Sequence, residues 1–318
     1  MRLLLRKLLT LVPTVLLVSF LTYVLVDLLP GDAATLLAGN DPREETINAI
    51  RDDLNLDDPL PVRYAKWLGG VMTGDFGRSF YSNQPVLDAI KERLPVTLEI
   101  GLIAMAFGLL LAIPLGIISA YRANRPIDRA ITTVSFGLLA IPNFVMALLL
   151  LYLFAIQLKL LPTVGWVPLT TDVGENLKRA ILPALSLSIG QVAVYTRLLR
   201  TDMITTLQED YVSMARAKGL PTWRILTRHA LRPSSFSLLT IVGLQVGALI
   251  GGAVIVENFF AVPGIGRLLF QSIGNRDLLM VQGVVLFIGV STVMANFLVD
   301  VAYTLLDPRI RRGDAGAA

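Results

Sequence analysis

The side chains of this 318-residue chain exclude most of the chemistry of enzyme active sites. The sequence has one histidine and no cysteine, so thiolate metal sites and His-based catalytic groups cannot be assembled. A phosphate-binding loop requires a Gly-Lys pair, and none occurs. We therefore predict no catalytic residue, no metal site and no cofactor bound by this chain.

The segment 201–233 combines basic residues with turn-forming ones. Gly219 suits the left-handed position that ends a helix, and Pro221 suits the first turn of the next helix. We therefore expect two short helices with a sharp break between them. Composition alone favours an anchor among lipid head groups, and the alternative is a docking element for a partner. The basic residues of the two predicted helices are Arg216, Lys218, Arg224, Arg228 and Arg232.

Three polar residues, Asn143, Gln191 and Glu257, are candidates for lining a path through a membrane. Asn143 directly follows Pro142, so its amide would either cap a kink or line a pore, and the kink is favoured. Ionisable groups in or near membrane spans often have a function in transport. At the end of a span, however, a carboxylate such as Glu257 is more often interfacial.

The elements that must position these residues are six long stretches without a charged side chain. Hydrophobic residues make up 54% of the chain and charged residues 16%, whereas soluble proteins have about 25% charged residues. A helix needs about 20 apolar residues to cross a bilayer, so we predict an all-α integral membrane protein with six transmembrane helices. The stretches are Leu8–Val26, Ile100–Tyr121, Ala130–Leu158, Ala180–Thr196, Pro233–Val256 and Leu278–Val299.

Two of these stretches allow more than one interpretation. The first has basic residues before it, as a signal peptide does, but no small-x-small cleavage site follows, so we expect an uncleaved span. The fourth is short and contains Ser186, Ser188, Gln191 and Tyr195. It would be either a weak span sheltered by its neighbours or a helix that faces a wet pathway, and the sequence does not decide between them.

The distribution of charge predicts how the chain is oriented. The segments 1–7, 122–129, 197–232 and 304–318 together hold 16 Lys and Arg against 6 Asp and Glu, whereas segment 27–99 holds 7 against 13. Basic loops face the cytoplasm, so both termini are expected there. The long segment between spans 1 and 2 should form a helical outer cap, because long ordered loops usually bind or cover something; a decorative loop is the alternative.

The run Asp210–Leu220 resembles the coupling loop of permeases from binding-protein-dependent ABC importers, in particular the dipeptide/oligopeptide/nickel family, although Ser213 stands where the general motif has glutamate. Further motifs resemble those of the same family and occur in the same order along the chain. The remaining motifs are Leu29–Asp32, Leu56–Pro59, Gly74–Ser79, Leu94–Leu98, Ala140–Phe144, Ile181–Ala184, Gly252–Phe260, Pro263–Gly266 and Leu306–Arg311.

The resemblance implies a division of labour among several subunits. A solute-binding protein outside the cell delivers the solute, this chain pairs with a second homologous permease, and two ATPase subunits bind ATP and Mg and grip the coupling loop. Small residues of the loop would pack in an ATPase groove and Arg216 and Lys218 would pair with acidic groups, whereas no nucleic acid is expected. The coupling residues are Ser213, Met214, Ala215, Arg216, Ala217, Lys218, Gly219 and Leu220.

The resemblance also implies the function, the place in the cell and the domain limits. The expected function is ATP-driven import of peptides across the cytoplasmic membrane of a prokaryote, and Glu257 becomes the favoured path residue. An ion-coupled transporter, a non-transporting scaffold or receptor, and a permease for nickel complexes or oligosaccharides are the alternatives. We expect the first span in 1–29, the cap in 30–94, the permease core in 95–307 with its coupling loop at 201–233, and a cytoplasmic tail in 308–318.

Overall fold

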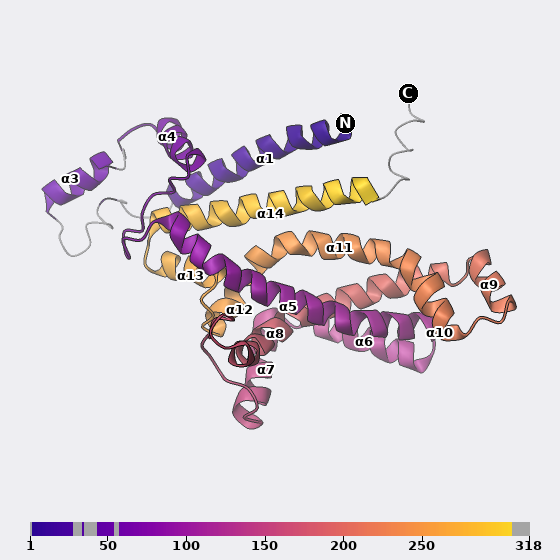
Figure 1. Cartoon of the computed structure of the whole chain (residues 1–318). Helices are drawn as coiled ribbons and strands as arrows, with labels where there is room; N and C mark the ends of the chain where they lie inside the picture. Colours follow the sequence, from indigo (N-terminus) through magenta and orange to yellow (C-terminus); the bar gives the residue numbers. More distant parts are fainter. Residues whose placement is uncertain (1, 28–33, 35–42, 54–56, 307–318) are drawn as a thin grey trace.

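The chain folds into an elongated bundle of helices in the computed structural model, which describes residues 2–27, 34, 43–53 and 57–306 (Figure 1). These residues form no β-strand, only an isolated bridge between Arg78 and Pro85. The helices are α1 (Arg2–Asp27), α3 (Glu44–Asp53), α4 (Leu60–Met72), α5 (Val86–Tyr121), α6 (Pro126–Ala140), α7 (Asn143–Leu150), the π-helix η1 (Leu151–Gln157), α8 (Val173–Thr206), α9 (Asp210–Ala217), α10 (Thr222–Arg224), the π-helix η2 (Ile225–Ala230), α11 (Leu231–Gly252), α12 (Val254–Phe259), α13 (Ile265–Gly274) and α14 (Leu278–Leu306).

Three helices of the described part are long and apolar enough to cross a membrane: α5, α8 and the Leu278–Val299 portion of α14. A fourth crossing is added if the pair formed by α6 and α7–η1 counts as one span. A shorter apolar segment, Leu11–Leu25, lies in α1. The all-helical prediction is confirmed, and the number of six spans stays a prediction.

The third predicted span is broken in the structure. Helix α6 and the following α7–η1 segment meet at an angle of 102°. Pro142 causes the break, because its ring disfavours helical geometry at the preceding residue; Ile141 is extended, with φ −84° and ψ 120°. Asn143 therefore begins a new helix and does not continue the first one.

Helices α8 and α5 form the centre of the lower half of the bundle in Figure 1. Between them lies a core that includes Ala112, Tyr195, Leu199 and Met203. Helix α8 is the most enclosed of the three long apolar helices, with 56% of its apolar window buried. This supports the interpretation that its serines and its tyrosine are sheltered by neighbours, and Ser186 and Ser188 indeed donate to carbonyls of their own helix.

The glycines of α11 allow α14 to approach closely. A methyl group added at Gly243 would lie 2.6 Å from Val299 Cγ1, and one at Gly247 would lie 3.1 Å from the Thr292 carbonyl oxygen. The Thr292 hydroxyl also donates to the Gly247 carbonyl at 3.0 Å. The spacing of four residues thus serves helix packing, as small residues do in membrane bundles.

The segment between α1 and α5 docks on α1 through α4. The Ser19 and Tyr64 hydroxyls lie 2.6 Å apart, and the ring of Tyr23 contacts those of Tyr64 and Trp67. In Figure 1, α3 and α4 lie at one end of the bundle and α9 lies at the other. The Leu29–Asp32 motif, nearly all of Leu306–Arg311 and the 308–318 tail lie outside the described residues.

Candidate functional site

The segment from α9 to η2 forms a helix–turn–helix at one end of the bundle (Figure 1). Helix α9 ends in a turn in which the Gly219 N–H donates to Arg216 and the Leu220 N–H donates to Ala215. Gly219 has φ +76°, so the predicted left-handed glycine is confirmed. Pro221 precedes α10 as its N-cap, one position earlier than the sequence predicted.

One face of α9 packs inside the chain. Val212 and Ala215 are 0% and 5% exposed and pack against Ile225, with Leu207 and Leu220 at the edges. The structure thus gives Ala215 an internal role where we expected it to contact an ATPase directly. The residues of the other face are exposed: Ser213, Met214, Arg216, Ala217, Lys218 and Gly219.

One polar contact lies within this segment, and another joins the two helices on either side of it. The Tyr211 hydroxyl donates to the His229 carbonyl at 3.3 Å, and burial, together with the Glu209 carboxylate, raises the pKa of Tyr211, so the hydroxyl keeps its proton. The hydroxyls of Thr206 on α8 and Ser234 on α11 lie 2.9 Å apart. The two arms of the helix–turn–helix are therefore held to each other, and so are the two helices that flank it.

Glu257 is enclosed. Its side chain is 0% exposed and accepts from the Thr97 hydroxyl at 2.6 Å and from the Arg267 N–H at 3.1 Å. Thr97 in turn accepts from the N–H of Ile265 at 2.8 Å. Glu257 therefore joins α12, α13 and α5, and it lines neither of the two cavities described below.

Asn143 and Gln191, by contrast, meet in one cavity of about 320 Å³. Gln245 of α11, which the sequence analysis did not single out, adds a third amide. Gln191 is 9% exposed, and its Oε1 atom has no hydrogen-bond partner among the described residues. The structure thus brings together two of the three predicted path residues.

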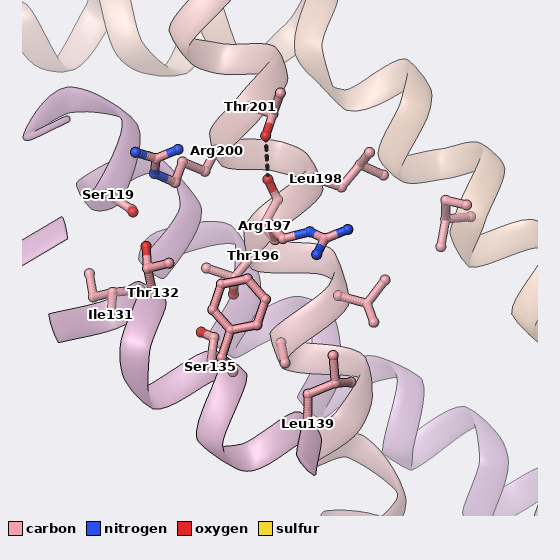
Figure 2. A pocket seen from close by; sticks show the side chains of 14 residues that line it. Ser119, Ile131, Thr132, Ser135, Leu139, Thr196, Arg197, Leu198, Arg200 and Thr201 are labelled. Carbon is pink, nitrogen blue, oxygen red and sulfur yellow. Dashed lines mark hydrogen bonds between the residues drawn. The ribbon is translucent and has the colours of Figure 1, made fainter. Parts of the chain in front are cut away.

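A second cavity, of about 640 Å³, adjoins the first, because Leu139 and Val194 line both. It lies among α5, α6, α8 and α11, and Figure 2 shows Thr132 and Ser135 of α6 facing α8. Arg197 and Thr201 follow one another by about one turn of α8 on its lining face. Polar groups thus stand on both sides of a largely apolar space.

The best-satisfied ionic contact of this region was missed by the sequence analysis. Asp128 of α6 accepts from Nε and Nη2 of Arg200 on α8, at 2.6 and 2.7 Å. It also accepts from the Ser119 hydroxyl of α5 and from the Asn124 N–H. No local pattern in the sequence links the two residues, which lie 72 positions apart.

Comparison with known proteins places this geometry in a family. Residues 112–312 match the binding-protein-dependent transport system inner membrane component family, and residues 1–101 match the N-terminal region of such membrane components. A Brucella abortus (strain 2308) protein named as a peptide transport system permease is 40% identical over 97% of this chain and 98% of its own length. The glutathione transport system permease protein GsiC of Escherichia coli (strain K12) is 36% identical over 96% and 97%.

The fold also has a solved counterpart. A chain of the MetNI methionine ABC transporter in an inward-facing conformation matches with a TM-score of 0.55 at 14% identity, covering 69% of this chain and 96% of that one. The helical fold of this chain thus agrees with that of a solved ABC transporter chain. The chain belongs to the family of binding-protein-dependent transport system inner membrane components, and it is a permease subunit of an ABC importer.

Proposed function

We propose that this permease moves peptides or similar small solutes across the cytoplasmic membrane of a prokaryote by alternating access. The names of the relatives in Brucella and Escherichia support this solute class. The excess of Lys and Arg in four segments supports six crossings with both termini in the cytoplasm and the 30–94 cap outside. In keeping with this, α1 begins and α14 ends toward the end of the bundle where α9 lies (Figure 1).

The observation that carries the proposal is the exposed face of α9. Two separate ATPase subunits would hold ATP and Mg, and one of them would bind this face, which presents Met214 with 58% of its surface exposed. Arg216 and Lys218 extend from the same exposed face and suit acidic groups of the partner. A solute-binding protein would dock on the outer face, and a second permease would complete the path.

The test introduces a negative charge on the exposed face of α9 and leaves the buried face unchanged. Met214→Glu places a charge in the proposed contact, so we expect co-purification of the ATPases and ATP-driven uptake of trialanine to fall at least tenfold, because an unpaired charge buried in an interface is strongly unfavourable. The control is Arg125→Glu, a charge change on an exposed residue of the turn between α5 and α6. Unchanged assembly and uptake in M214E would refute the coupling role.

A further experiment separates ATP-driven import from ion-coupled transport. Proteoliposomes that contain the full complex and the binding protein should accumulate trialanine only with ATP inside the compartment that holds the ATPases. Uphill accumulation by this chain alone, without nucleotide, would contradict the proposed function.

A further inference from the structure

Arg197 carries a positive charge that the fold does not neutralise. No carboxylate among the described residues lies within 4.0 Å of its guanidinium. Its Cζ atom lies over the ring of Phe136, 5.9 Å from the ring centroid. The side chain is exposed on the cavity-lining face of α8 (Figure 2). An unpaired guanidinium in a largely apolar cavity is a strong site for an anion, because Arg prefers planar, bidentate acceptors such as carboxylates.

The neighbouring arginine has a different state. Arg200 is held by both oxygens of Asp128, so that pair contributes no net charge to the cavity. The charge that the 640 Å³ space presents therefore comes from Arg197. Hydroxyl groups of Thr132, Ser135 and Thr196 also line the space, and the Thr196 Oγ1 atom has no hydrogen-bond partner among the described residues.

The remaining wall is apolar, which suits an organic anion better than a small inorganic one. Solute sites are typically cavities of about 300–1,000 Å³ with apolar walls and a few placed polar groups. The apolar lining residues are Ile131, Phe136, Leu139, Ala193, Val194, Leu198 and Ile241.

The distance from Arg197 to the adjoining amide cavity sets the length of the proposed ligand. Gln191 and Arg197 are separated by six residues of one helix, which is a rise of about 9 Å. An extended peptide covers about 3.4 Å per residue, so two to three residues bridge this distance. Side-chain amides suit backbone N–H and C=O groups, because each amide both donates and accepts.

We propose that Arg197 binds the C-terminal carboxylate of a short peptide whose backbone amides face Asn143, Gln191 and Gln245. This inference rests on the proposed function, since it names the solute of the same path. The arginine would distinguish peptides with a free C-terminus from blocked ones as they pass through the permease.

The experiment compares trialanine with trialanine amide, which differ in the carboxylate alone. Both are titrated calorimetrically into the assembled permease–ATPase complex without nucleotide and without binding protein. The wild type should bind trialanine at least about tenfold more tightly than its amide, because a hydrogen bond to a charged group contributes that much or more. Arg197→Gln should bind both equally weakly, and Arg197→Lys should keep part of the preference because it keeps the charge.

The matched control is Arg129→Gln, because Arg129 is exposed on the same helix as Ser135 but does not line the cavity. It should behave as the wild type. A tenfold preference that persists in R197Q, or a wild type that binds both peptides equally, would overturn the inference.

The outcome stays separate from that of the proposed function. ATP-driven uptake of trialanine by the wild type tests the function, whereas the ratio of the two affinities in R197Q tests the site. If R197Q instead releases the second permease during purification while M214E does not, Arg197 belongs to the interface between permeases, and the solute site is refuted.

Discussion

Asp128→Asn is the change whose cost the structure defines best. Asp128 is 2% exposed and binds Arg200 through both carboxylate oxygens, at 2.6 and 2.7 Å. Removing one member of a buried ion pair costs about 3–5 kcal/mol. The Arg200 side chain is 25% exposed, so water recovers part of that loss and we expect about 2–3 kcal/mol. Asparagine also presents an N–H₂ group where the carboxylate accepted, which leaves one donor facing another.

The assay is an unfolding titration of the purified chain in mixed micelles, with helix content followed by circular dichroism. D128N, Arg200→Gln and the double variant form a cycle whose coupling energy should exceed about 1.5 kcal/mol, because the two residues are in direct contact. The control is Asp88→Asn, since Asp88 is 57% exposed and lies 3.8 Å from Lys91. That exposed pair should contribute no more than about 0.5 kcal/mol.

Two results would show that the reasoning is wrong. D128N could destabilise by less than about 1 kcal/mol, which would mean that Arg200 finds other acceptors. Alternatively, the effects of the two single substitutions on the free energy of unfolding could add up to the effect of the double substitution. This would mean that the two residues stabilise separate parts of the bundle and not each other.

Two glycines provide further predictions. Gly243→Ala should destabilise the chain by about 1–3 kcal/mol in the same titration, because its methyl group would lie 2.6 Å from Val299 Cγ1. Adding Val299→Ala should recover most of this loss of stability. If stability is not recovered, this contact is excluded as the cause. In Gly219→Ala the added methyl group meets no neighbouring atom, but the residue must keep φ +76°. The change should therefore cost about 1 kcal/mol of backbone strain and speed hydrogen exchange in α9. Gly219→Asn should cost less, and equal costs for the two variants would contradict the left-handed turn.

Local patterns of the sequence predicted the features that depend on neighbouring residues. The left-handed turn at Gly219 and the helix break before Pro221 follow from backbone preferences of single residues. Gly243, Gly247 and Gly251 recur every four residues, which puts them on one face of α11, where small side chains allow a neighbouring helix to approach. The partner helix, α14, could not be read from that spacing, since any neighbour would satisfy it.

Contacts between distant residues escaped the sequence analysis. Asp128 and Arg200 are 72 residues apart, and nothing in either local sequence indicates the other. Gln245 lies in an apolar run and joins Asn143 and Gln191 only because α7, α8 and α11 converge. Ala215 is another example. Its small size led us to expect close approach by an ATPase, but the group that packs against it is Ile225 of this chain.

Helix α8 lines both cavities and leads into α9, and this gives the proposed function a mechanical basis. The helix continues without a proline after Pro183 as far as Thr206, where it leads into α9. From Gln191 to Thr206 the rise is about 22 Å, so a tilt of about 10° around the amide cavity would displace the α9 end by about 4 Å. Arg197 lies between the two points and would move less than α9 but more than Gln191. A force applied at α9 would therefore change the width of the cavity lined by Arg197, whereas the amides of the adjoining cavity would keep their positions. A solute that enters through the amide cavity would then be released from the cavity lined by Arg197.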